Sequence, residues 1–151
     1  MRLSRQKAFL LVLASSIACS GTTAPETVSA FFVLQSVNGQ PVPAVLFSEP
    51  TRTRTVISSN LILDKQGHAT INEADREDLQ GVVTESVLTA TLDYRLTADQ
   101  IEIGSFTPCP PNALCAANAT GTISNGALTL NNPLPAPNKI YVYRTVPTDP
   151  V

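Results

Sequence analysis

Apolar and polar residues alternate along most of the chain after position 28, a pattern typical of short β-strands. The clearest case is the segment 82–96, in which every second residue from Leu88 to Leu96 is apolar and the residues between are polar or charged. Because side chains point alternately to the two faces of a strand, this segment is predicted to have one buried apolar face and one solvent-exposed polar face. Its length predicts a bend or a bulge near Glu85.

Turn signals divide the rest of the chain into further strands. Two hairpins are predicted, one around the turn Asp64–Gly67 and one around Asn125-Gly126, because each turn places a glycine after polar residues between two apolar runs. The acidic stretch Glu73–Gln80 and the proline-rich segment 132–139 are predicted to be loops. The predicted strands are 29–37, 44–48, 51–58, 61–63, 68–72, 82–96, 101–107, 119–124, 127–131 and 140–146.

These short strands, mostly neighbours in sequence and joined by tight turns, predict an all-β fold. The architecture expected is an antiparallel up-and-down barrel of about eight strands, with no substantial helix after the N-terminal leader. Closure of the barrel would pair the first and last strands and remove their open edges. A barrel of this size is either filled by its own side chains or holds one small ligand, and the sequence leaves both possibilities open.

The N-terminus reads as a signal peptide. Arg2, Arg5 and Lys7 precede an apolar run at 8–14, and small residues lead up to Cys19. The run is too short to cross a bilayer, which takes roughly 20 residues. An ordinary secretory signal that is cleaved elsewhere, with Cys19 as a bystander, is the alternative.

The segment Ser16-Ile17-Ala18-Cys19 resembles the lipobox of bacterial lipoproteins. The resemblance implies cleavage before Cys19, which would then carry a diacylglycerol and an N-acyl chain such as palmitate. Several acyl chains anchor a protein firmly, whereas a single chain binds only marginally. Ser20 after the cysteine implies the outer membrane in a cell that has two.

The expected organisation is therefore a leader, a tether and one domain. Residues 1–18 are the lipoprotein signal peptide, 19–27 the acylated cysteine with a polar tether, 28–146 a single barrel domain and 147–151 a tail. The chain has 10 basic and 12 acidic residues, and three of the basic ones lie in the leader, so the remainder is clearly acidic. A negative domain without a Lys/Arg cluster lacks the footprint of nucleic-acid binding.

Cys109 and Cys115 flank the short loop Pro110–Leu114. Because an exported protein meets an oxidising compartment, the two cysteines are predicted to form a disulfide. A zinc site is a weaker alternative, since the spacing is not Cys-x-x-Cys and His68 is distant in sequence. A redox pair is weaker still, for want of the same motif.

The remaining candidates for chemistry each have a structural explanation. His68 is expected to be a solvent-facing strand residue rather than a general base. Tyr141 and Tyr143 share one face of the last strand and are expected to pack in the core or at its rim. Four carboxylates surround Arg76 and could bind calcium, but their spacing is not that of a calcium loop, and a solvated acidic loop is favoured. The four are Glu73, Asp75, Glu77 and Asp78.

Four segments together resemble uncharacterised small bacterial lipoproteins with a lipocalin-like β-barrel. They are Phe32–Pro43, Asp64–Gly67, Gly121–Leu130 and Tyr141–Arg144. The resemblance implies an envelope protein that reaches the membrane through its lipid anchor at Cys19.

Two functions follow as expectations. The first is a lipid-anchored binding module whose barrel takes a small apolar ligand. The second is a structural or protein-interaction lipoprotein with a filled core, whose loops at 73–80 and 109–115 meet another envelope protein. No nucleophile, base and orienting group can be named together, so no catalytic residue, metal or cofactor is expected and an enzyme is not predicted.

Overall fold

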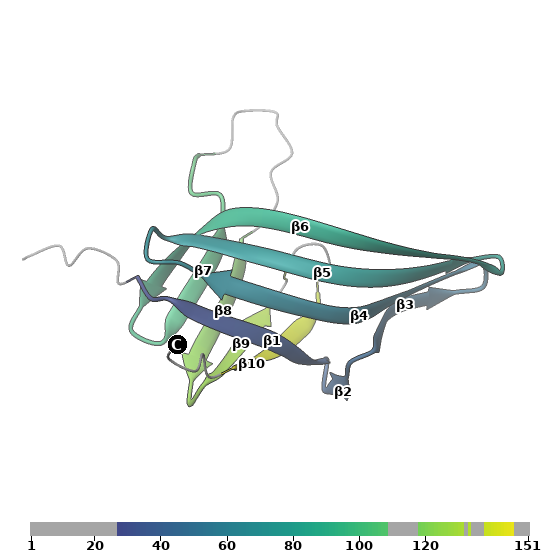
Figure 1. Ribbon diagram of the computed structural model, residues 1–151, viewed down its shortest axis with the longest axis horizontal. Coiled ribbons are helices and arrows are strands. Elements are labelled where there is room, and N and C mark those ends of the chain that lie inside the picture. Colours follow the sequence, from purple (N-terminus) through teal and green to yellow (C-terminus); the bar gives the residue numbers. More distant parts are fainter. Residues whose placement is uncertain (1–26, 109–117, 132, 134–137, 147–151) are drawn as a thin grey trace, which may run out of the picture.

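The computed structural model describes residues 27–108, 118–131, 133 and 138–146 of the chain, and within them all regular structure is β-strand (Figure 1). The described strands are β1 (Ala30–Val37), β2 (Gln40–Pro41), β3 (Ala44–Glu49), β4 (Arg52–Leu63), β5 (His68–Leu79), β6 (Val82–Thr97), β7 (Gln100–Gly104), β8 (Ala119–Ser124), β9 (Ala127–Asn131) and β10 (Ile140–Thr145).

The strands close into an antiparallel, up-and-down barrel of eight strands, which confirms the predicted fold class. The order around the barrel is β1-β10-β9-β8-β7-β6-β5-β4, and β4 returns to β1 over the register Ala30↔Leu63 to Val33↔Asn60. The two remaining strands add to this wall: β2 pairs with the end of β1, and β3 pairs with the outer half of β4. Pairing of β4 with β1 removes the two free edges that the sheet would otherwise expose at these strands.

Both predicted hairpins are present, and local chemistry explains them. The Asp64 carboxylate accepts hydrogen bonds from the backbone N–H groups of Gln66 (2.9 Å) and His68 (2.8 Å), which fixes the turn between β4 and β5. Asn125 and Gly126 have φ values of 50° and 70° between β8 and β9. Asparagine and glycine adopt these left-handed conformations most readily, and a two-residue hairpin turn needs them.

The prediction of an acidic loop at Glu73–Gln80 is wrong. Strand β5 continues through this stretch to Leu79, pairing with β4 on one side and with β6 on the other along its whole length. Glu77 and Asp75 form ion pairs with Arg52 and Arg54 of β4, and Arg76 within the stretch pairs with Glu85 of β6. These pairs offset the repulsion among the carboxylates. The chain turns later, at Gln80-Gly81.

The predicted strand irregularity also lies elsewhere. The pairing of β6 with β5 runs from Leu79↔Val82 to His68↔Asp93 without a register shift, so no bulge occurs near Glu85. A shift occurs instead in β4 between Val56 and Ser58. The segments 51–58 and 61–63, predicted as separate strands, are thus one long strand that bends at this point.

The interior of the barrel is closely filled by side chains. The inward-facing positions are mainly Leu, Ile and aromatic residues, as the alternation predicts, and Tyr141 and Tyr143 are buried among them. The core consists of Phe32, Leu34, Val37, Ala44, Leu46, Val56, Leu61, Leu63, Ala69, Ile71, Tyr94, Leu96, Ile101, Ile103, Ala119, Leu128, Leu130, Tyr141 and Tyr143. The middle of the barrel is therefore packed rather than hollow.

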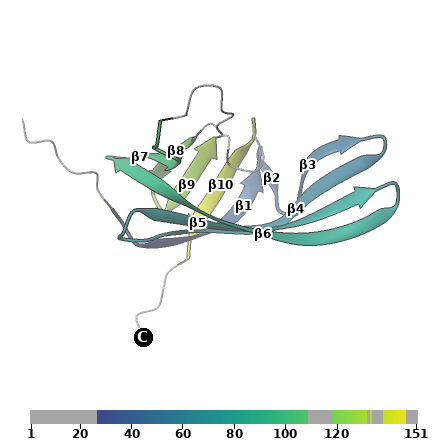
Figure 2. The same cartoon turned by 90° about the horizontal axis from the view of Figure 1, so that it is seen from above.

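Strands β4, β5 and β6 are much longer than the others, and their outer halves run beyond the barrel together with β3. Figure 2 shows the β3–β4 and β5–β6 hairpins leaving the barrel as one curved sheet. We call this part, formed by residues 44–56 and 75–88, the extension. It has no second layer among the described residues, so its side chains are mostly exposed.

Candidate functional site

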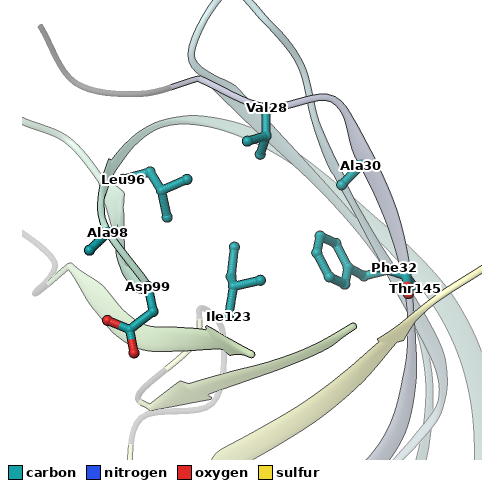
Figure 3. Close-up of a pocket in the computed structure, with 8 residues that line it drawn as sticks. All are labelled: Val28, Ala30, Phe32, Leu96, Ala98, Asp99, Ile123 and Thr145. Atoms are coloured by element: carbon teal, nitrogen blue, oxygen red, sulfur yellow. The ribbon is translucent and has the colours of Figure 1, made fainter. Parts of the chain in front are cut away.

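An apolar cavity of about 400 Å³ opens at one end of the barrel (Figure 3). This end carries the Asp64–Gly67, Ala98-Asp99 and Asn125-Gly126 turns and the start of β1. Four segments of the chain contribute to the wall of the cavity. The lining residues are Val28, Ala30, Phe32, Leu96, Ala98, Asp99, Ile123 and Thr145.

Strand alternation explains why apolar groups gather there. Ala30 and Phe32 occupy successive inward positions at the start of β1, and Leu96 is the last inward position of β6. Figure 3 shows Val28, Phe32, Leu96 and Ile123 pointing toward a common space. Phe32 and Leu96 are themselves almost fully buried, so they form the boundary between the cavity and the packed core.

The Tyr94 hydroxyl holds the chain at the mouth of this cavity. It accepts a hydrogen bond from the N–H of Val28 (2.8 Å) and lies within donating distance of the carbonyls of Asp64 (2.8 Å) and Val28 (3.0 Å). Burial raises the pKa of Tyr94, which keeps the hydroxyl protonated. The segment that leads into β1 is thereby fixed to the barrel wall and becomes part of the cavity lining.

A second unusual group of side chains, which we call the polar cluster, lies where the barrel meets the extension. Glu73 and Asp75 occupy successive inward positions on β5 and are 0% and 4% exposed. The Arg54 guanidinium on β4 forms an ion pair with Asp75, and its Nη2 lies 3.8 Å from Glu73 Oε1. One arginine thus faces two buried carboxylates, so their negative charge is only partly offset.

Within the described structure, no hydrogen bond of good geometry reaches either carboxylate oxygen of Glu73. Burial and the negative charge of Asp75 raise the pKa of Glu73 to about 7, against the smaller opposing effects of the Tyr141 hydroxyl and Arg54. Burial also raises the pKa of Tyr141 and Tyr143, whose rings lie 6.1 Å apart. The Tyr143 hydroxyl is 3.2 Å from Ser59 Oγ. The polar cluster therefore holds a proton at Glu73 up to about neutral pH.

The sequence-predicted site residues are dispersed. His68 is exposed at the start of β5, and its Nδ1 lies 3.2 Å from Asp93 Oδ1. No group of three His, Cys, Asp or Glu side chains within the described ranges could hold a metal ion. The lipidation site Cys19 and the cysteines Cys109 and Cys115 lie outside the described residues, so the anchor and the disulfide stay predictions.

Sequence reasoning missed both the cavity and the polar cluster. The cavity brings together residues from four segments, and no short motif marks them. The cluster did leave a signal, because Glu73 and Asp75 have the same parity along β5 as the core residues Ala69 and Ile71. Inward and outward positions continue to alternate through the acidic stretch, as in a strand. The polarity of its residues nevertheless led to the prediction of a loop.

The described part of the chain contains no helix with the length and hydropathy of a membrane span. Comparisons of the chain with protein-family models, with curated proteins and with solved structures found no match.

Proposed function

We propose that this protein is a lipid-anchored lipoprotein of the bacterial envelope that binds a small apolar molecule in the cavity at the turn end of its barrel. The observation that carries the proposal is the cavity itself, which is concave and mainly apolar in a barrel whose interior is otherwise filled. Ligand sites typically have this character and a volume of about 300–1,000 Å³.

The proposed anchor would bring the cavity close to the membrane. Val28 lines the cavity, and Cys19 precedes it by only nine residues in the sequence. Even fully extended, a segment of this length spans only about 30 Å. A cavity mouth held so near a bilayer suits a ligand that partitions into lipid and is taken from, or passed to, the membrane surface.

The lining also limits the chemistry of the ligand. Side chains of Val28, Phe32, Leu96 and Ile123 offer dispersion contacts and no hydrogen bonds, so the ligand must bury an apolar body against them. Asp99 is the one lining residue with a charged side chain. An uncharged ring system or a short acyl chain, with any polar end directed toward this residue, fits these requirements.

Binding can be tested with the apolar fluorescent probe N-phenyl-1-naphthylamine on the full chain carrying Cys19→Ala, in buffer without lipid or detergent, because a bilayer would itself take up an apolar probe. Ala30→Phe fills the cavity and is expected to weaken probe binding at least about tenfold, a loss of about 1.4 kcal/mol. Val45→Phe is the matched control, because Val45 is exposed on β3, far from the cavity. Equal probe binding by the parent and by Ala30→Phe would show that the cavity is not the site.

The anchor is tested separately. Cys19→Ala is expected to move the protein from the membrane fraction to the soluble fraction, because acylation needs the cysteine thiol. Mass spectrometry of the parent should find a mature chain that begins at Cys19 and carries acyl mass. A variant that stays with membranes, or a mature chain that begins elsewhere, contradicts the lipoprotein assignment.

The packed middle of the barrel favours a second candidate, a structural or interaction lipoprotein without a small ligand. Native mass spectrometry of the protein purified from its own cells separates the two. A co-purified small molecule supports the binding function, and a ligand-free barrel that also rejects the probe supports the interaction role.

A further inference from the structure

One edge of strand β6 is open over most of its length. β7 pairs with β6 only from Asp93 to Thr97, whereas β5 pairs with the other side of β6 from Val82 to Asp93. From Val82 to Leu92 the second side of β6 therefore has no strand beside it in the described structure, as Figure 1 shows along the right-hand half of the strand. The open edge is about 35 Å long at the usual rise per residue.

The direction of the free backbone groups follows from one hydrogen bond. The N–H of Tyr94 donates to the carbonyl of Gly67, which lies on the β5 side. Because backbone groups alternate along a strand and no register shift interrupts β6, the even-numbered residues face β5 and the odd-numbered ones face the open edge. The residues that present N–H and C=O groups outward are Val83, Glu85, Val87, Thr89 and Thr91.

This edge lacks the features by which proteins usually protect open strands. It contains no lysine, arginine, proline or bulge. Its single charged side chain, Glu85, accepts hydrogen bonds from Arg76 Nε (3.0 Å) and Nη2 (2.8 Å) and so is held on its own sheet. Val82, Val83 and Val87 are exposed by 64%, 55% and 73%. The edge therefore combines free backbone groups with apolar side chains on both faces.

We propose that the open edge of β6 binds the same edge of a second copy of the protein, antiparallel about a two-fold axis at Val87. Only a register centred on Val87 pairs the whole edge from Val82 to Leu92 with itself. In this register the outward-facing pairs exchange about ten backbone hydrogen bonds in total. The two barrels lie at opposite ends of the paired strands, which keeps them apart.

The side chains suit this register. Val87 lies opposite Val87 of the partner subunit, and Val82 lies opposite a leucine, the partner's Leu92. Glu85 lies opposite a threonine, the partner's Thr89, so the only charge on the edge meets no like charge. Apolar pairs on the two faces and the absence of opposed charges are what stabilise cross-strand pairing.

The register can be tested by introducing a charged side chain at position 87 of the full chain. The mass of the protein is then measured by light scattering in detergent. The parent is expected to be a dimer. Val87→Arg places two arginines opposite each other and is expected to raise the dimer dissociation constant at least about tenfold, as is Val87→Glu. Mixing the two variants should restore a dimer, because arginine then faces glutamate.

Val83→Arg is the matched control, since Val83 is also exposed on the outer face but lies opposite a threonine, the partner's Thr91, in this register. It should remain dimeric. A monomeric parent, a dimer that survives Val87→Arg, or a mixture that stays monomeric would overturn the proposal. Circular dichroism confirms that each variant is folded, which is expected because the substituted side chains are exposed. The outcome does not depend on whether the cavity binds a ligand.

Discussion

The same three strands build two very different regions of this protein. The inner halves of β4, β5 and β6 form part of the barrel wall, where one face of each is buried, as at Leu61 and Ile71. Their outer halves form the extension, where β6 is exposed on both faces from Val82 to Thr89. The backbone ladder between β5 and β6 continues unbroken through both regions, so the pairing of these two strands does not distinguish them.

The difference between the regions is what covers the sheet. In the barrel, apolar side chains from the opposite wall cover each inner face, and burial supplies the main stabilisation. Toward the tip of the extension no such layer is described, and some positions of β4 and β5 there carry charged side chains that pair across strands, as Arg52 does with Glu77. Exposed ion pairs of this kind contribute little to stability. The extension should therefore be the more weakly held part of the fold.

The largest contrast is expected from one substitution made in both regions. Leu61→Ala in the barrel should lower the free energy of unfolding by about 3–4 kcal/mol, because Leu61 is fully buried. Leu79→Ala at the tip of the extension should change it by less than about 0.5 kcal/mol, since that side chain is half exposed. Urea unfolding measures both. Equal losses would mean that the extension is covered in solution.

Glu73 lies at the boundary between the two regions, and Glu73→Gln tests how the ionisation of this group makes the free energy of unfolding depend on pH. The folded-state pKa of Glu73 is about 7 and its ordinary value is 4.5, so between these values the folded protein keeps a proton that the unfolded chain has lost. The stability contributed by this group therefore falls as pH rises through that window and is level above it, a loss of up to about 3 kcal/mol.

In Glu73→Gln this pH dependence should disappear, and the variant should be more stable than the parent at pH 8. Urea unfolding at several pH values between 4 and 9 checks the expectation. Glu77→Gln is the control, because Glu77 is partly exposed in the extension. A parent whose stability does not fall across the window would show that Glu73 ionises normally.

Two arginines on β4 give a smaller contrast. Arg54→Ala leaves Glu73 and Asp75 without their cation and should cost about 2 kcal/mol, because both carboxylates are buried. Arg52→Ala removes an exposed pair with Glu77 and a contact over the Phe47 ring, and should cost less than about 1 kcal/mol. Thermal unfolding at neutral pH compares them. A larger loss for Arg52→Ala would reverse the ranking of the two regions.

A local effect is expected at the barrel end that carries the cavity. Tyr94→Phe removes the hydroxyl that bonds Val28 and Asp64, and should cost about 1–2 kcal/mol. Hydrogen exchange should locate the loss at the amide of Val28, which would exchange faster, while amides of the extension keep their rates. Unchanged exchange at Val28 would contradict the role of this hydroxyl.

The sequence alone could predict those features of the fold that depend on residues close together in the chain. The turns at Asp64–Gly67 and Asn125-Gly126 depend on residues within each turn, and the alternation in β6 depends only on strand geometry. Strand β5 could not be predicted past Asn72, because its buried carboxylates need Arg54, a cation from another strand. Long-range pairing overrides local polarity in such a case.

The same reason explains why the candidate sites were not predicted. Val28, Leu96 and Ile123 meet at the cavity only because the barrel closes, and nothing near any of them in the sequence signals the others. The open edge of β6 also depends on a distant event, the end of β7 at Gly104. Each site is a property of the closed sheet rather than of a motif.

The bond between Tyr94 and the chain entering β1 has a mechanical consequence. Tension on a surface-attached N-terminus would reach the hydrogen bonds between Val28 and Tyr94 before it reached the pairing of β1 with β4 and β10. The load would pass sideways into β6, which β5 supports over many residues. If the proposed anchor is present, drag on the molecule would therefore strain the hydrogen bonds of Tyr94 to Val28 before it strained the pairing that closes the barrel.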